Sequence, residues 1–159
     1  MNGYTFNNFD KEHMARARGI AMPISFKHSV EICRFIKNKN INDAKKILEK
    51  VMLKEIAIPF KKYNFDLGHK TKIGPGRYPE KASKQFIKLI EEVEANAQFK
   101  GLNTSNLVIT HISAHNSGKA WHYGRKSRRK MKRTNVDIVI EEKGKIDNKK
   151  NESKKKKSD

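Results

Sequence analysis

Cysteine and long apolar runs are nearly absent from this sequence. Cys33 is the single cysteine among 159 residues, so an intrachain disulfide and a zinc site built from cysteines are excluded. No run of about 18 apolar residues occurs, and the N-terminus lacks the apolar stretch of a secretory signal peptide. These absences predict a soluble protein of a reducing compartment, the cytoplasm, with no membrane partner.

Acidic residues are missing from a long internal segment. Between Glu94 and Asp137 there is not one Asp or Glu, whereas nine Lys and Arg residues lie in that segment. The whole chain has 36 basic and 17 acidic residues, and residues 1–142 alone keep 28 against 14. A surface that serves only solubility mixes both signs of charge. The imbalance therefore indicates contact with a polyanion.

Patterns that carry catalysis are also missing. The sequence contains neither G-x-x-x-x-G-K-[ST] nor G-x-G-x-x-G between a strand and a helix, and "GPGRYP" is predicted to be a turn. His111 and His115 are four residues apart, but on a strand that spacing is about 13 Å, too far for one zinc ion. His28 and His69 have no nucleophile or acid pattern beside them. We therefore predict no catalytic residue, no metal site and no cofactor.

Apolar periodicity predicts two helices in the first third of the chain. The first follows Ser25, a candidate N-cap, and extends to about Lys37. The second follows Asn42, its candidate N-cap. The two apolar stripes, which place Cys33 in the core, are Phe26, Val30, Cys33 and Ile36, then Ala44, Ile47, Leu48 and Val51.

A third helix is indicated more strongly. Pro79 is expected at its first helical position, and Gly101 ends the pattern. The acids of this helix are predicted to form a solvated face, and they are Glu91, Glu92 and Glu94. Its apolar stripe consists of Ala82, Phe86, Leu89, Val93 and Ala97.

Three segments have the pattern of strands. "ARARGIAMP" predicts a strand with one basic face, at a sheet edge because Pro23 cannot donate a ladder hydrogen bond. Residues 107–115 and 135–141 are rich in Val, Ile and Thr. The connection between them has no apolar stripe to pack a crossover helix, which favours a hairpin. If both arms stay extended, they project about 30 Å beyond the core.

The hairpin connection contains "GRKSRRKMKR", with seven basic residues in ten positions. Alone, such a run is as often a solvated loop or a nuclear localisation signal. Within an acid-free hairpin that its own core cannot hold, it needs an anionic partner to order it. A second segment, residues 58–78, also indicates contact with nucleic acid. It shows no helical or strand periodicity, and basic residues alternate there with aromatic residues. Cations reach phosphates and rings stack on unpaired bases, as RNA-binding surfaces use them.

We therefore predict nucleic-acid contacts from basic residues of the first strand, the first helix, the 58–78 segment, the start of the third helix and the hairpin. They are Arg16, Arg18, Lys27, His28, Lys61, Lys62, His69, Lys70, Lys72, Arg77, Lys81, Lys119, Arg125, Lys126, Arg128, Arg129, Lys130, Lys132 and Arg133.

Residues 12–142 resemble one known family. The segments that carry the resemblance are "ISFKHSVEICRFIKNKNINDAKKILEKVM", "GHKTKIGPGRYPEKAS" and "NLVITHISAH…VDIVIEE". They are similar to the universal large-subunit ribosomal protein L-twenty-two, in the branch of archaea and eukaryotes. The resemblance implies an α+β fold: three helices packed on a small three-stranded antiparallel sheet, with a long projecting β-hairpin.

The resemblance also implies a function and partners. Members bind large-subunit ribosomal RNA early in assembly, are not enzymes, and line the peptide exit tunnel with the hairpin tip. The implied partners are that RNA, neighbouring large-subunit proteins and the nascent peptide, with no homo-oligomer. The tip would contain Trp121, His122, Tyr123, Gly124 and Arg125, although only the Gly124–Arg125 pair matches the family's usual tip sequence.

Three units follow along the chain: an N-terminal extension over residues 1–14, a globular RNA-binding domain over 15–142 with its hairpin over about 111–136, and a Lys-rich tail over 143–159 that is predicted to be disordered. Two other functions stay open. One is a free-standing nucleic-acid-binding regulator or architectural protein, which the charge supports equally. The other is an RNA-processing enzyme that uses His111, His115 or His122.

Overall fold

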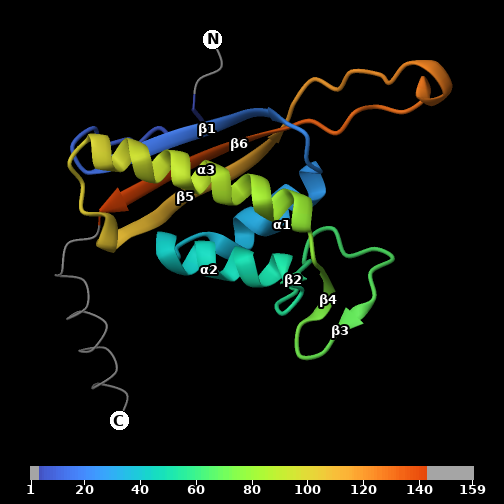
Figure 1. The fold of residues 1–159 in the computed structure, drawn as a ribbon, viewed down its shortest axis with the longest axis horizontal. Helices are drawn as coiled ribbons and strands as arrows, with labels where there is room; N and C mark the ends of the chain where they lie inside the picture. Colours follow the sequence, from blue (N-terminus) through green and yellow to red (C-terminus); the bar gives the residue numbers. More distant parts are fainter. Residues whose placement is uncertain (1–3, 143–159) are drawn as a thin grey trace.

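A computed structural model describes residues 4–142, and the predicted Lys-rich tail lies outside the described residues. The fold is α+β, with three helices and two antiparallel sheets of three strands each. Figure 1 shows the helices on one side of the larger sheet, and the smaller sheet at the end from which the hairpin projects. The predicted fold class is confirmed, and the smaller sheet is an addition to it.

The larger sheet has the strand order β1-β6-β5, formed by β1 (Met14–Met22), β6 (Thr134–Glu142) and β5 (Leu107–Asn116). The predicted edge position of the first strand is confirmed. Alternate residues of the central strand, Val136, Ile138 and Ile140, are buried in the core. This alternation follows from the pleat, which sends successive side chains to opposite faces.

The three predicted helices are confirmed as α1 (Phe26–Ile36), α2 (Ile41–Met52) and α3 (Glu80–Phe99). Two predicted starts are wrong. Asn40, not Asn42, caps α2, because the Asn40 side chain accepts a hydrogen bond from the backbone N–H of Asn42 (3.0 Å). Pro79 is the N-cap of α3 rather than its first helical residue.

The helices pack through their predicted stripes with two differences. Helices α1 and α3 lie against the sheet, while α2 packs chiefly on α3. Cys33 is buried as expected, but Phe26 and Val30 are only half-buried because α1 turns its Ile32 side fully inward. The predicted solvated position of Glu94 is wrong, since its carboxylate forms an ion pair with Lys45 of α2.

The segment predicted to be irregular contains the smaller sheet. Its order is β2-β4-β3, with β2 (Ile58–Pro59), β4 (Gly74–Arg77) and β3 (His69–Lys70). "GPGRYP", predicted to be a turn, therefore begins with the central strand of this sheet. Gly76 is needed there, because a Cβ atom would lie 3.2 Å from the Ile58 carbonyl oxygen on the neighbouring strand.

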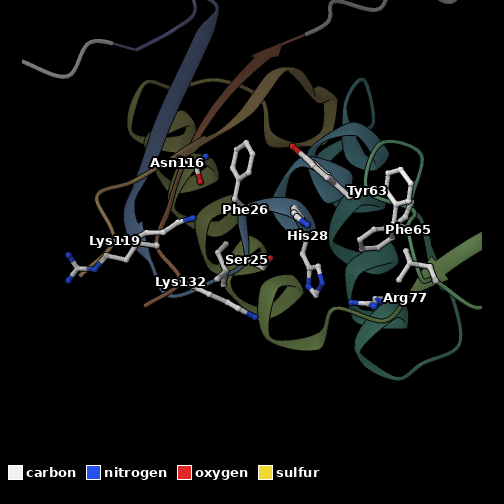
Figure 2. Close-up of a pocket in the computed structure, with 14 residues that line it drawn as sticks. Ser25, Phe26, His28, Tyr63, Phe65, Arg77, Asn116, Lys119 and Lys132 are labelled. Atoms are coloured by element: carbon white, nitrogen blue, oxygen red, sulfur yellow. The ribbon is translucent and has the colours of Figure 1, made fainter. Parts of the chain in front are cut away.

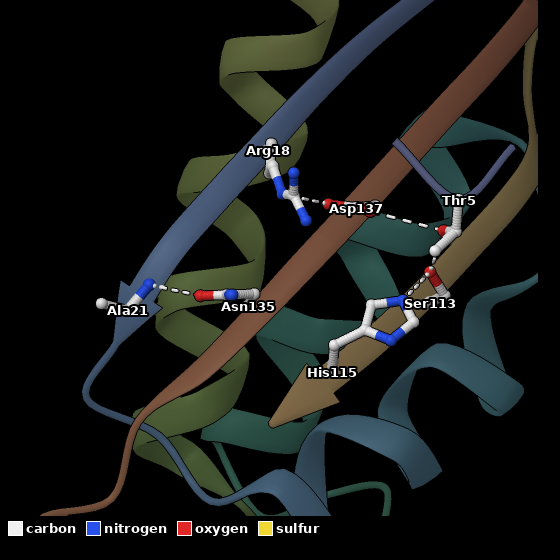
Figure 3. A network of polar contacts seen from close by, with 7 residues as sticks. All are labelled: Thr5, Arg18, Ala21, Ser113, His115, Asn135 and Asp137. Carbon is white, nitrogen blue, oxygen red and sulfur yellow. Dashed lines mark hydrogen bonds and ion pairs between the residues drawn. The ribbon is translucent and has the colours of Figure 1, made fainter. Parts of the chain in front are cut away.

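The N-terminal segment crosses the face of the larger sheet that the helices leave open. The Arg16 guanidinium lies against the rings of Tyr4 (4.2 Å) and Phe9 (4.5 Å), and the Thr5 hydroxyl donates to buried Asp137 (3.4 Å). Asp137 also pairs with Arg18 at 2.8 Å, as Figure 3 shows. The N-terminal segment thus packs on the polar outer face of the sheet, where Asp137 compensates the charge of Arg18.

Beyond Asn116 and Thr134 the hairpin leaves the sheet with few cross-strand contacts. Backbone hydrogen bonds join Met131 to Ala120 (2.8 Å) and His122 to Arg129 (2.9 Å), and a short 3₁₀ turn (Gly124–Lys126) forms the tip. Figure 1 shows this connection extending away from the helices. Within residues 4–142, no helix has the length and apolar character needed to cross a membrane.

Candidate nucleic-acid interface

A groove of about 590 Å³ opens where three parts of the chain meet. Its lining comes from the start of α1, from the segment around β2 and β4, and from the base of the hairpin. Figure 2 shows the hairpin side chains on one side of this groove and the rings of the 60–67 segment on the other. Segments about 30 to 100 residues apart in sequence therefore form one surface.

The groove is cationic. Every charged residue among the described residues that line it carries positive charge: Lys27, Arg77, Lys119, Lys132 and Arg133. Helix α1 begins at the groove with no acid in its first turn, so the partial positive charge of the helix N-terminus adds to the same field. Such a surface attracts phosphates and releases their counterions.

The pKa of His28 is affected by the positive charges around the groove. Figure 2 shows its ring between Lys132 and Arg77, and the ring also meets Phe60 edge-on with centroids 5.6 Å apart. Burial lowers the pKa of His28, and the positive charges of Arg77 and Lys132 lower the pKa further. The neutral imidazole is thus favoured near neutral pH, and a bound phosphate would reverse that effect.

Aromatic rings form the other wall of the groove. Phe26 and Tyr63 meet edge-on with centroids 6.3 Å apart, and the Lys27 ammonium lies 5.7 Å from the Tyr63 centroid. Phe60 is buried and belongs to the core, whereas Phe65 is 89% exposed. Cations and accessible rings thus line the same groove, the combination that binds single-stranded RNA.

Glu31 fixes the aromatic wall, and sequence reasoning missed it. Its side chain is buried on α1 and accepts hydrogen bonds from three consecutive backbone N–H groups, those of Lys61 (3.2 Å), Lys62 (2.8 Å) and Tyr63 (3.1 Å). The sequence feature that could have indicated its role is an acidic residue directly before Ile32 and Cys33 in a helix with an apolar face. A buried carboxylate needs such partners, because its desolvation is otherwise costly.

The structure brings together only part of the predicted RNA-contacting set. Six of these residues line the groove, namely Lys27, His28, Arg77, Lys119, Lys132 and Arg133. The basic residues around the hairpin tip, Arg125, Lys126, Arg128, Arg129 and Lys130, are all exposed along the projecting connection.

The remaining members of the set are dispersed. His69, Lys70 and Lys72 are exposed on the smaller sheet and its β3–β4 turn, while Lys81 lies at the start of α3. Lys61 and Lys62 are exposed beside the groove. Arg16 and Arg18 engage the N-terminal segment and Asp137, so their charges already have partners within the fold.

At the predicted hairpin tip, four of the five residues are exposed to solvent, while His122 is half-buried. The Trp121 ring is 58% exposed and the Tyr123 ring 88%, and the Lys130 ammonium lies 4.5 Å from the Trp121 centroid. Gly124 has φ +61°, a conformation in which a side chain would be strained, at the start of the 3₁₀ turn. The tip therefore presents rings and charge without an apolar core of its own.

Comparison with known proteins identifies the family. The family model described as "Ribosomal protein L22p/L17e" matches residues 17–139. This chain belongs to the L22p/L17e family of ribosomal proteins. The match covers most of the larger sheet, all three helices and the whole hairpin, so the resemblance found in the sequence is confirmed.

Archaeal relatives agree with this L22p/L17e assignment along nearly their full length. The large ribosomal subunit protein uL22 of Archaeoglobus fulgidus is 42% identical over 146 residues, which cover 87% of this chain and 94% of that protein. The protein of the same name from Methanosphaera stadtmanae is 39% identical over 150 residues, covering 89% and 97%. Both relatives are named as proteins of the large ribosomal subunit.

Proposed function

We propose that this L22p/L17e protein is a structural constituent of the large ribosomal subunit that binds large-subunit ribosomal RNA and supports early assembly of the subunit in the cytoplasm. One observation carries the proposal: a cationic surface without acids runs from the groove at α1 into the projecting hairpin. The names of the archaeal relatives support the same subunit.

The physical mechanism is phosphate neutralisation combined with shape. Lys and Arg side chains of the groove and hairpin replace the counterions of closely spaced phosphates, and the released counterions provide the entropy of binding. A hairpin with few internal contacts gains order when RNA surrounds it, because the RNA screens the repulsion among its cations. Shape, rather than the reading of base edges, fixes the position of the protein on structured RNA.

The hairpin tip is the part proposed to line the peptide exit tunnel. Trp121, Tyr123 and Arg125 are exposed there, so they are available to contact a nascent peptide. Other large-subunit proteins are proposed as neighbours, and no second copy of this chain is required.

A free-standing nucleic-acid-binding regulator is the second candidate, because the net charge of +19 would also serve DNA. Sedimentation of a native lysate through a sucrose gradient in about 0.5 M salt distinguishes the two candidate functions. The reversible binding of a polycation to nucleic acid weakens steeply as the salt concentration rises. We expect the protein to remain with large subunits. Its release to the top of the gradient, or recovery on DNA, would support the regulator instead.

A further inference from the structure

Resting on the proposed function, we infer that the groove at the start of α1 holds one unpaired nucleotide of the RNA. Its base lies against the rings of Phe65 and Tyr63, and its phosphate lies between Arg77 and Lys132. The hairpin would anchor the protein in RNA through phosphates, whereas the groove would recognise a nucleotide that has left a helical stack.

Phe65 has no folding role that explains its position. Its side chain is 89% exposed, although it is one of the residues that line the groove. An exposed phenyl ring gains little from water but gains stacking and apolar burial when a base covers it. A ligand with a flat face is therefore the partner that its chemistry fits.

The cations on either side of His28 supply the contacts that a phosphate needs. Arg77 comes from β4 and Lys132 from the returning arm of the hairpin, and Figure 2 shows them on either side of His28. Lys27 and Lys119 add charge from α1 and the outgoing arm. The rings of Tyr63 and Phe65 and the cations on either side of His28 match the two halves of a nucleotide.

An unpaired nucleotide fits this arrangement better than a duplex. In an RNA duplex the bases are stacked on one another, so a protein meets phosphates and 2′-hydroxyls but few base faces. The rings would then have no partner. A groove of about 590 Å³ also has the size of sites that bind small ligands, which range from about 300 to 1,000 Å³.

The groove is already formed in the protein alone, which favours binding of a single nucleotide. Glu31 holds the backbone of residues 61–63, and Phe26 supports the Tyr63 ring from its edge. A site whose side chains are positioned beforehand loses less conformational entropy when the ligand enters.

Two matched substitutions in the full-length protein test the inference. Phe65→Ala removes the ring in the groove, and Phe99→Ala removes a ring that is 94% exposed at the end of α3 and does not line it. The probes are an eight-nucleotide single-stranded oligoadenylate and a twelve-base-pair RNA duplex, both followed by fluorescence anisotropy. Circular dichroism is the control that checks whether both variants are folded.

Phe65→Ala is expected to weaken binding of the single strand about tenfold, because stacking contributes about 1–3 kcal/mol per base. Binding of the duplex should change less than twofold, and Phe99→Ala should change neither. Tyr63→Leu should weaken single-strand binding in the same selective way.

The inference is overturned if Phe65→Ala and Tyr63→Leu both leave single-strand affinity unchanged, or if they weaken single strand and duplex equally. In that case the groove binds only phosphates. The proposed ribosomal function would still stand if the unmodified protein remained with large subunits in the salt gradient. Loss of the protein from those subunits would contradict the function itself, whatever the two oligonucleotides showed.

Discussion

Replacing Arg125, Arg128, Arg129 and Arg133 with glutamate is expected to abolish stable incorporation of the protein into large ribosomal subunits. All four side chains are exposed on the hairpin connection, so the fold does not depend on them. Each lost phosphate contact reduces the salt dependence of binding, and the reversed charges add repulsion. We expect RNA affinity at about 0.15 M salt to fall more than about 100-fold. Occupancy of the variant in gradient-purified subunits measures the effect.

A control variant carries the same change in net charge elsewhere. Lys46, Lys50, Lys84 and Lys88 are exposed on α2 and α3, away from the groove lining and the hairpin. Their replacement with glutamate is expected to leave most subunit occupancy intact. Equal loss from both variants would mean that net charge alone drives binding, and normal occupancy of the hairpin variant would contradict an anchoring role.

Glu31→Ala is expected to lower the free energy of unfolding by about 3 kcal/mol, because three backbone N–H groups lose their charged acceptor. For a chain of this size that loss corresponds to a fall in Tm of roughly 6–12 °C. The backbone of residues 61–63 should also become mobile. Urea unfolding gives the first quantity, and amide hydrogen exchange at Lys61, Lys62 and Tyr63 gives the second.

The matched control for Glu31 is Glu92→Ala, on the exposed side of α3. An exposed substitution of this kind changes stability by less than about 0.5 kcal/mol. If Glu31→Ala costs no more than Glu92→Ala, or if the three amides exchange at unchanged rates, Glu31 does not fix the aromatic wall of the groove.

The long elements were predictable because their signals repeat. Helix α3 has five apolar residues at helical spacing, and Gly101, with φ +78°, follows its end as expected for a left-handed cap. Strands β5 and β6 were found from their β-branched content. The start of α2 was misplaced by two residues because Asn40 and Asn42 are equally good caps by residue type, and only the hydrogen bond between them decides.

The smaller sheet could not be predicted in the same way. Its strands are two to four residues long, too short to show a period, and β4 is composed of Gly-Pro-Gly-Arg, which local rules assign to a turn. Its strand pairs are set by tertiary contacts, with Gly76 lying close to the backbone of β2. Local propensity gives way to such contacts in short strands.

The residue types of the candidate site could be predicted from the sequence, but their arrangement in space could not. Charge and aromatic spacing indicated nucleic acid and identified six of the residues that line the groove. Charge and aromatic spacing did not distinguish the groove residues from Arg18, which pairs with Asp137 instead. Asp137 lies more than a hundred residues from Arg18 in the sequence, so this pair could not be foreseen. Glu31 was missed for the same reason, since its role exists only once the 61–63 backbone folds over α1.

Photo-crosslinking within purified large subunits shows directly whether the groove and the hairpin contact RNA. Ultraviolet light joins RNA bases to side chains in contact with them, and mass spectrometry then identifies the linked peptides. We expect links in residues 24–28 and 60–67 at the groove and in residues 117–133 of the hairpin. Links confined to the exposed faces of α2 and α3, with none in those segments, would contradict this expectation.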